Sequence, residues 1–137
     1  MSDSDSTAPP LLEVRGLKTW FGTRSGDVHA VDGVDLDVRR GEVLGLVGES
    51  GSGKSVTMMS VLRLVERPGR IVEGSVRFDG VELTDLPRKR LRDLRGNRIS
   101  MIFQQPNASL HPCYPAGVQV SEVFEIHRNT RRKVGID

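Results

Sequence analysis

The octapeptide Gly48–Ser55 (GESGSGKS) constrains the fold of this chain more than any other segment. It matches the pattern G-x-x-x-x-G-K-[ST], and the composition of this chain gives such a match by chance with a probability on the order of 0.6%. A continuous apolar run, 42–47, precedes the loop, and a stretch with buried-helix character, 56–65, follows it. Because loops of this pattern bind phosphates between a strand and a helix, the sequence predicts an α/β fold with a phosphate-binding loop.

Each residue type in the loop has a chemical reason. Glycines let the backbone wrap a polyanion closely, with its N–H groups pointing inward. Lys54 would bring a positive charge to the β- and γ-phosphates, and the Ser55 hydroxyl suits Mg²⁺. A dinucleotide site is excluded, because the pattern G-x-G-x-x-G begun at Gly51 needs a glycine where Val56 stands. The loop therefore predicts binding of a mononucleoside triphosphate.

The rest of the chain predicts short elements around this loop. Alternating or continuous apolar residues indicate strands, and the run 42–47 is typical of a strand covered on both faces. This order of elements indicates a mixed α/β sheet. We expect strands at 12–21, 34–38, 42–47 and 99–103, a hairpin at 71–83 turning at Asp79-Gly80, a loop at 22–27, and helices at 56–65, 87–96 and 118–127.

Composition excludes several other classes of protein. Leu, Ile, Val and Phe make up 39 of the 137 residues, well above the range of wholly disordered chains. No window of about 18 residues is free of charges, which excludes a membrane span. The acidic segment 1–10 lacks the features of a signal peptide and predicts a disordered tail on a cytoplasmic protein. The single cysteine, Cys113, cannot form an internal disulfide.

The segment 88–98 concentrates positive charge in a chain whose net charge is only +2. It holds six basic residues against one acid, Asp93. Such a run can follow a nucleic-acid backbone, or it can be the solvated face of a helix. No aromatic residue interrupts it to stack on bases, which favours the solvated face.

Two further features bear on a nucleotide site. Trp20 and Phe21 precede the loop and could supply a flat platform for an adenine ring, or they could simply pack in the core. Gln104 follows an apolar run, where its amide oxygen could accept a hydrogen bond from a metal-bound water, or where it could simply begin a loop. From the residues alone, both alternatives stay open for each feature.

Two segments carry a resemblance to a known family. Val31–Ser55 (VDGVDLDVRRGEVLGLVGESGSGKS) resembles the start of the nucleotide-binding domain of ABC transporters. Ile99–Pro112 (ISMIFQQPNASLHP) resembles the Q-loop segment of the oligopeptide/dipeptide (peptide/nickel) importer branch. Two positions depart from that branch: Gln105 stands where the family usually has an acid, and His111 stands where it usually has an asparagine. The resemblance covers roughly residues 11–132. It implies an α/β P-loop NTPase: the N-terminal portion of an ABC nucleotide-binding domain with an antiparallel β subdomain, incomplete at this length.

The resemblance also implies roles for single residues, with ATP and Mg²⁺ as cofactors. Phe21 matches the aromatic residue that stacks on adenine, with Trp20 as the second choice. Gln104 matches the glutamine that contacts Mg²⁺ or its water, and Ser55 is the other metal ligand. Beyond Lys54 and Gln104, no catalytic residue is assignable. The residues expected to bind the nucleotide are Phe21, Gly48, Glu49, Ser50, Gly51, Ser52, Gly53, Lys54, Ser55 and Val56.

Two motifs of the family do not occur in this sequence. ABC domains hydrolyse ATP as sandwich dimers, with a Leu-Ser-Gly-Gly-Gln-like signature and a Walker B run that ends in Asp-Glu. His29, His111 and His127 match no catalytic position. Because phosphoryl transfer needs an oriented water, we expect this chain to bind ATP without hydrolysing it efficiently alone. The expected organisation is a tail (1–10), the P-loop and β subdomain (11–104), and the Q-loop exit with the start of a truncated helical subdomain (105–137).

The resemblance implies an energy-coupling, ATP-binding subunit of a peptide-type importer, peripheral on the inner face of the cell membrane. Its partners would be membrane-spanning permease subunits and a second ATP-binding subunit, with no nucleic acid and no direct membrane insertion. The alternative is a non-catalytic nucleotide-binding or interaction module that functions at this length. A third interpretation, an ABC ATPase acting on nucleic acid, rests only on the basic run. The sequence does not determine whether the cargo is a peptide, nickel or another substrate.

Overall fold

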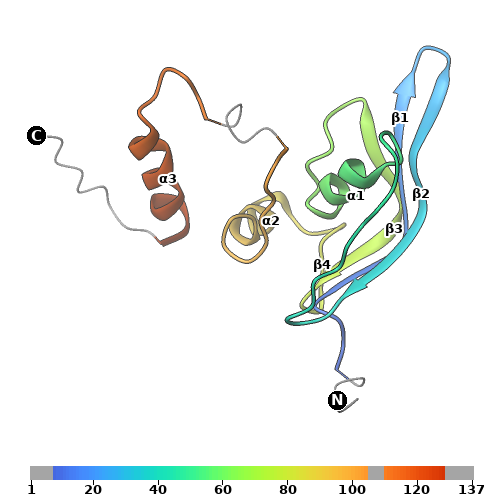
Figure 1. Cartoon of the computed structure of the whole chain (residues 1–137), viewed down its shortest axis with the longest axis horizontal. Helices are drawn as coiled ribbons and strands as arrows, with labels where there is room; N and C mark the ends of the chain where they lie inside the picture. The colour runs from blue at the N-terminus through green and yellow to red at the C-terminus, as the bar shows by residue number, and fades with distance from the viewer. Residues whose placement is uncertain (1–7, 105–109, 129–137) are drawn as a thin grey trace, which may run out of the picture. The chain divides into compact units, whose positions relative to one another are not determined.

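The structure, a computed structural model, describes residues 8–104 and 110–128 (Figure 1). The chain divides into two compact units, Met1–Leu86 and Pro87–Asp137, and each is described by itself. The predicted tail lies largely outside the described residues, as does the segment 105–109 of the predicted Q-loop. The first unit holds β1 (Leu12–Thr23), β2 (Gly26–Val38), α1 (Lys54–Val61), β3 (Gly69–Phe78) and β4 (Val81–Glu82), and the second holds α2 (Arg88–Leu94) and α3 (Ala116–Arg128).

The first unit is built on one antiparallel sheet with the strand order β2-β1-β3-β4. β1 and β2 form a long hairpin in which Thr23 pairs with Gly26, so the predicted loop at 22–27 is shorter than expected. The predicted hairpin at Asp79-Gly80 is confirmed. These two residues have φ angles of 51° and 76°, which suit the tight turns that match the twist of paired strands.

An irregularity at Gly16 decides which side chains of β1 are buried. The pairing with β2 shifts between Val14 and Leu17, and Gly16 between them has a φ of +55°. Val14, Leu17 and Thr19 are consequently all fully buried, although an unbroken strand would place Val14 and Leu17 on opposite faces. Gly74 of β3 lies against this point, where an added Cβ would stand 2.5 Å from the Leu17 Cα. The bulge therefore needs the space that Gly74 leaves.

Helix α1 lies against β1 and β2 (Figure 1). It begins two residues before the predicted start at 56. It ends at Val61 rather than at 65, because Arg63 adopts a φ of +52° that a helix cannot continue. On the buried face, the Thr19 and Ser60 hydroxyls are 2.8 Å apart. Ser60 Oγ also donates to the Val56 carbonyl at 2.7 Å. This polar pair fixes the helix that follows the phosphate loop to the centre of the sheet.

Thr19→Val should destabilise the chain by about 1–2 kcal/mol, because it keeps the shape of the side chain and leaves a buried hydroxyl without one partner. Urea unfolding of Thr19→Val, Ser60→Ala and the double variant would measure the coupling between the two hydroxyls. We expect a coupling of about 1 kcal/mol, as found for groups in direct contact. Strict additivity of the two single changes would contradict the pairing.

Two predicted strands are wrong, because the described residues contain no strand at 42–47 or at 99–103. Val43 is 96% exposed, Val47 is 99% exposed and Ile102 is 90% exposed. A continuous apolar run indicates a strand covered on both faces. Within the described residues no strand pairs with either run, so the backbone stays irregular and the side chains meet solvent.

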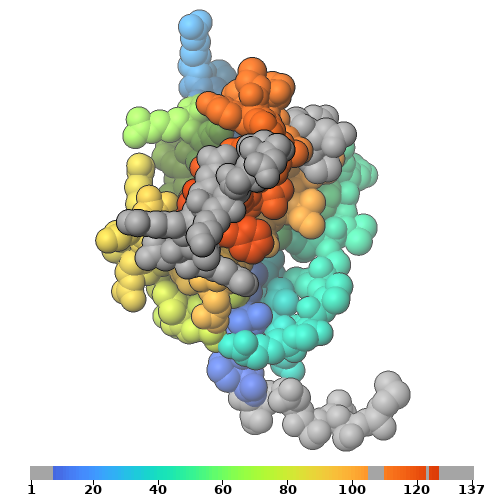
Figure 2. Space-filling model, turned by 90° about the vertical axis from the view of Figure 1, so that its left-hand side faces the viewer, coloured from blue at the N-terminus to red at the C-terminus, as the bar shows by residue number. Residues whose placement is uncertain are grey.

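The second unit confirms two predicted helices, since α2 lies within 87–96 and α3 includes 118–127. α3 exposes large apolar side chains, among them Val120, Phe124 and Ile126, and its orange and red atoms lie at the surface in Figure 2. Among the described residues, no helix is both long enough and apolar enough to cross a membrane.

Candidate functional site

The predicted phosphate loop leads directly into α1. Gly51 and Gly53 have φ angles of +82° and +87°, in the left-handed region that favours glycine. Gly53 occupies the N-cap position of α1, with no side-chain capping bond. The first N–H groups of a helix have no partner inside the helix, and no side chain caps them here. They are therefore available to a ligand.

Gly53 is also the point where the loop is fixed to the sheet. A Cβ added there would stand 2.4 Å from the carbonyl oxygen of Ala30 in β2. On the other side, the backbone N–H and the hydroxyl of Thr57 donate to the Gly53 carbonyl at 2.8 Å and 3.0 Å. The position thus requires glycine for space as well as for its backbone angle.

The ammonium group of Lys54 folds back into the loop. Its Nζ donates to the carbonyls of Gly48 and Glu49 at 2.7 Å and 2.6 Å, and to the Ser52 hydroxyl at 3.0 Å. This charge stands at the N-terminal end of α1, whose own dipole is already positive there. No acidic residue lies in the first turn to compensate. An anion bound in the loop would therefore be stabilised by both the helix end and the ammonium.

The residues present fit a phosphate with a divalent cation better than a cation alone. The described part of the chain contains no group of three or more His, Cys, Asp or Glu residues that could hold a metal ion. Ser55, the second residue of α1, is exposed. Mg²⁺ commonly keeps several waters and shares the oxygens of phosphates. The Ser55 hydroxyl could therefore be one protein ligand of such an ion, with phosphate and water oxygens among the others.

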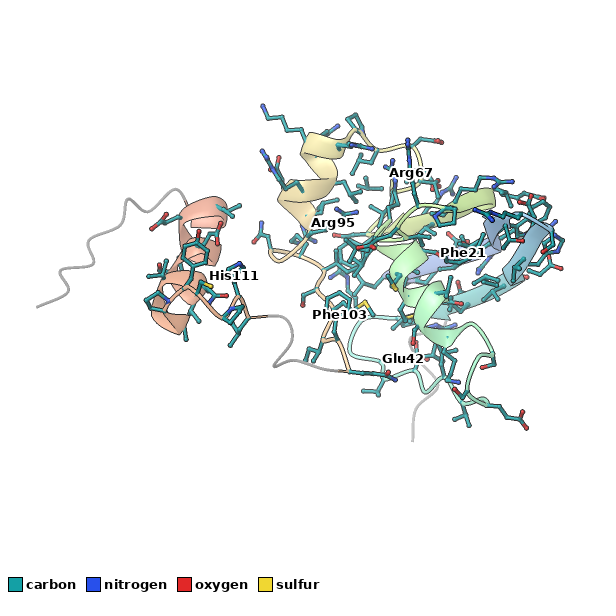
Figure 3. The ribbon with its side chains drawn as sticks, turned by 90° about the horizontal axis from the view of Figure 1, so that it is seen from above. Phe21, Glu42, Arg67, Arg95, Phe103 and His111 are labelled. Atoms are coloured by element: carbon teal, nitrogen blue, oxygen red, sulfur yellow. The ribbon has the colours of Figure 1, made fainter. Side chains whose placement is uncertain are left out.

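Of the two predicted aromatic platforms, Trp20 already has a stacking partner. Its ring lies on the imidazole of His29 with centroids 4.0 Å apart and an angle of 8° between the planes. Phe21 is half-buried in β1, and a Cβ added at Gly69 would stand 2.6 Å from its ring. Figure 3 shows Phe21 among the strands of the first unit. The assignment of Phe21 to adenine stays a prediction.

Gln104 lies in an exposed bend of the second unit. Gly48–Ser55 lie in the first unit, as the loop 48–53 and the first two residues of α1, whereas Gln104 belongs to the unit described separately. Its predicted contact with a metal ion held by Ser55 therefore stays a prediction.

Two residues important for the site were missed in the sequence: Ala30 limits the space at Gly53, and His29 covers Trp20. Ser52 is in the predicted nucleotide-binding set, but its hydrogen bond with the Lys54 ammonium was not predicted. The alternation of β2 could have suggested that Ala30 lies in a strand. Nothing in the sequence indicates that its carbonyl faces the loop, because that depends on how α1 packs against the sheet.

The chain is similar to known proteins in both sequence and fold. The sequence pattern of the family described as "ABC transporter" matches residues 31–130. The oligopeptide transport ATP-binding protein AppD of Bacillus subtilis (strain 168) is 44% identical over 124 residues, covering 90% of this chain and 38% of AppD. The dipeptide transport ATP-binding protein DppD of Escherichia coli (strain K12) is 42% identical over 131 residues, covering 93% of this chain and 40% of DppD. The chain thus spans about two-fifths of the length of these relatives.

Solved structures show the same fold. The dimeric structure of MJ0796, a bacterial ABC transporter cassette, superposes with a TM-score of 0.73 at 23% identity, covering 92% of this chain and 50% of that one. A post-hydrolysis state of the MJ0796 cassette, bound to ADP and Pi, gives a TM-score of 0.69 with the same coverage. At this identity, the likeness concerns the fold alone.

Proposed function

Because this chain belongs to the ABC transporter family, we propose that it binds ATP with Mg²⁺ as part of the ATP-binding subunit of a peptide importer. The observation that carries the proposal is the loop, where the Lys54 ammonium and the uncapped start of α1 converge on one anion site. The similarity to AppD and DppD, whose names state peptide transport and ATP binding, supports the choice of cargo class and ligand.

The proposed roles follow the geometry of the loop. Backbone N–H groups of the loop and of the first turn of α1 hold the phosphates, and Lys54 neutralises their charge. Ser55 coordinates Mg²⁺ through its hydroxyl oxygen, and Gln104 is the other proposed metal ligand. Phe21 stacks on the adenine ring. The proposed nucleotide-binding set is Phe21, Gly48, Glu49, Ser50, Gly51, Ser52, Gly53, Lys54, Ser55 and Val56.

The wider assembly is part of the same proposal. Residues 11–104 form the P-loop and β subdomain, and 105–137 begin a helical subdomain that contacts membrane-spanning permease subunits. A second ATP-binding subunit completes the site, which the dimeric form of the MJ0796 cassette supports. The subunit would then work at the inner face of the cell membrane, without inserting into it.

Isothermal titration of the 137-residue chain with ATP and Mg²⁺ tests the binding function. We expect one site per chain with micromolar affinity, and weaker binding when Mg²⁺ is chelated. Absence of any heat or fluorescence change at millimolar ATP, in a sample shown to be folded by circular dichroism, would contradict the proposal.

Hydrolysis is tested separately, because the proposal makes this chain a binding part without a general base. Steady-state phosphate release by the 137-residue chain should equal the background of buffer with ATP. Turnover that depends on Lys54 would refute this second statement while leaving ATP binding intact. The non-catalytic module, the alternative, would gain if the chain folds cooperatively, binds ATP, and shows no association with permease subunits.

A further inference from the structure

Helix α2 exposes a cluster of cations that the proposed nucleotide site does not use. We call it the basic patch and define it as Arg88, Lys89, Arg90 and Arg92, all of them exposed. No ion pair to any of the four is found among the described residues. By contrast, most arginines in the strands of the first unit pair with a carboxylate, as Arg70 does with Asp27 at 2.6 Å.

The positive charges of the patch repel one another along the helix that carries them. Arg88, Lys89 and Arg92 together line a depression of about 390 Å³. Arg88 and Arg92 are one turn apart, a spacing at which like charges repel, and no acidic residue lies in the first turn. The long side chains of α2 project outward from the pale yellow helix in Figure 3. The one acid of α2 is Asp93, which stands four residues after Lys89, and it forms no ion pair with the patch among the described residues. The repulsion between Arg88 and Arg92 is therefore a local conflict of the kind expected where a site serves function.

The neighbouring side chains limit which partner can fit. Leu91 is 2% exposed and Leu94 is half-buried, so α2 offers no exposed apolar anchor of the kind that protein interfaces use. It also has no aromatic side chain on which a nucleic-acid base could stack. A surface of phosphate headgroups needs neither, because its attraction to clustered Lys and Arg is electrostatic.

We propose that the basic patch binds the phosphate headgroups of an anionic phospholipid surface. The depression between Arg88, Lys89 and Arg92 takes one headgroup phosphate, and Arg90 adds to the attraction from beside it. The inference goes beyond the proposed function. It depends on that function in one respect, which is that an importer subunit works beside a membrane. It requires contact with headgroups and no insertion into the bilayer.

Co-sedimentation with lipid vesicles tests the proposal without nucleotide. The 137-residue chain should bind vesicles of phosphatidylcholine with roughly one-third phosphatidylglycerol, and not vesicles of phosphatidylcholine alone. Because each Lys or Arg at such a surface contributes about a factor of five, the triple variant Arg88→Gln/Lys89→Gln/Arg92→Gln should bind roughly 100-fold more weakly. Binding by the unchanged chain should also fall steeply with salt, since the screening length shrinks from about 10 Å at 0.1 M to about 3 Å at 1 M.

A matched control separates the patch from net charge. Arg24→Gln/Arg39→Gln/Arg67→Gln removes the same charge from three exposed arginines of the first unit. It should change vesicle binding by less than about threefold, because these side chains do not cluster on α2. Equal losses in the two triple variants would overturn the proposal, as would no binding to the anionic vesicles. Tighter binding to duplex DNA, or to an acidic peptide, than to the vesicles at the same salt would also overturn it.

Two further measurements keep the result interpretable. If the triple variant loses its circular dichroism signal, the single changes Lys89→Gln and Arg92→Gln replace it, each with an expected loss of about fivefold. ATP affinity should be the same in all these variants. A variant that loses vesicle binding but keeps ATP binding tests the basic patch alone. If the unchanged chain fails to bind ATP, that result counts against the proposed function and not against the patch.

Discussion

Lys54→Ala should lower the affinity of the chain for ATP by roughly 100-fold, a loss of about 2.7 kcal/mol. The change removes the one side-chain cation at the loop, whose Nζ lies 2.6–3.0 Å from three loop oxygens. Hydrogen bonds from a charged donor contribute about 1.5–3 kcal/mol each, and phosphates are acceptors of this kind. Isothermal titration with ATP and Mg²⁺ measures the loss directly.

Lys18→Ala is the matched control for this change. It removes the same charge from the sheet, where Lys18 pairs with Glu73 at 2.7 Å. ATP affinity should stay within about twofold of the unchanged chain, because an exposed ion pair contributes little and does not touch the loop. Equal affinities for the Lys54→Ala and Lys18→Ala variants would show that the loop is not the nucleotide site.

Gly53→Ala should destabilise the chain by at least about 3 kcal/mol and abolish ATP binding. A left-handed backbone costs an alanine about 1–2 kcal/mol. In addition, the new Cβ would stand 2.4 Å from the Ala30 carbonyl, which is backbone and cannot turn away. Either α1 separates from the sheet or the loop changes shape, and each outcome removes the anion site. Urea unfolding and ATP titration measure the two effects.

Gly51→Ala separates the two causes within the same loop. Gly51 has nearly the same φ, +82°, but a Cβ there would meet nothing within 4 Å. It should therefore cost only the backbone term of about 1–2 kcal/mol, with ATP binding weakened rather than lost. Equal destabilisation by Gly51→Ala and Gly53→Ala would show that the contact with Ala30 does not position the loop.

Local patterns predicted the elements that depend on local chemistry. The sequence predicts that the glycines of the loop occupy strained or crowded backbone positions, and Gly51 and Gly53 both have a positive φ. The turn at Asp79-Gly80 and the helices α2 and α3 depend on neighbours in sequence, and all three were predicted. The bulge at Gly16 was not predicted, because a glycine in a strand does not by itself say which pairing shifts.

The two wrong strands show the limit of periodicity. The apolar runs at 42–47 and 99–103 carry the composition of buried strands, yet Val43 and Val47 are almost fully exposed. Apolar composition indicates only that a segment is compatible with burial on both faces. Whether it pairs depends on a second strand, and strand pairing is a contact between distant parts of a chain. Sequence pattern alone carries no information on whether that partner is in place.

The sequence by itself determined the pattern of the phosphate loop and the family, and it predicted a nucleotide as the ligand, because these depend on residue types at fixed spacing. Only the tertiary structure decided that Gly53 needs space against Ala30, that Lys54 folds onto Gly48, Glu49 and Ser52, and that His29 covers Trp20. The stacking of His29 on Trp20 is set by the register of β1 with β2, and the approach of Gly53 to Ala30 is set by the packing of α1 on the sheet. The Lys54 bonds lie within the loop and depend on its folded shape. Spacing along the chain fixes the chemistry of the loop, whereas packing between its elements fixes its shape.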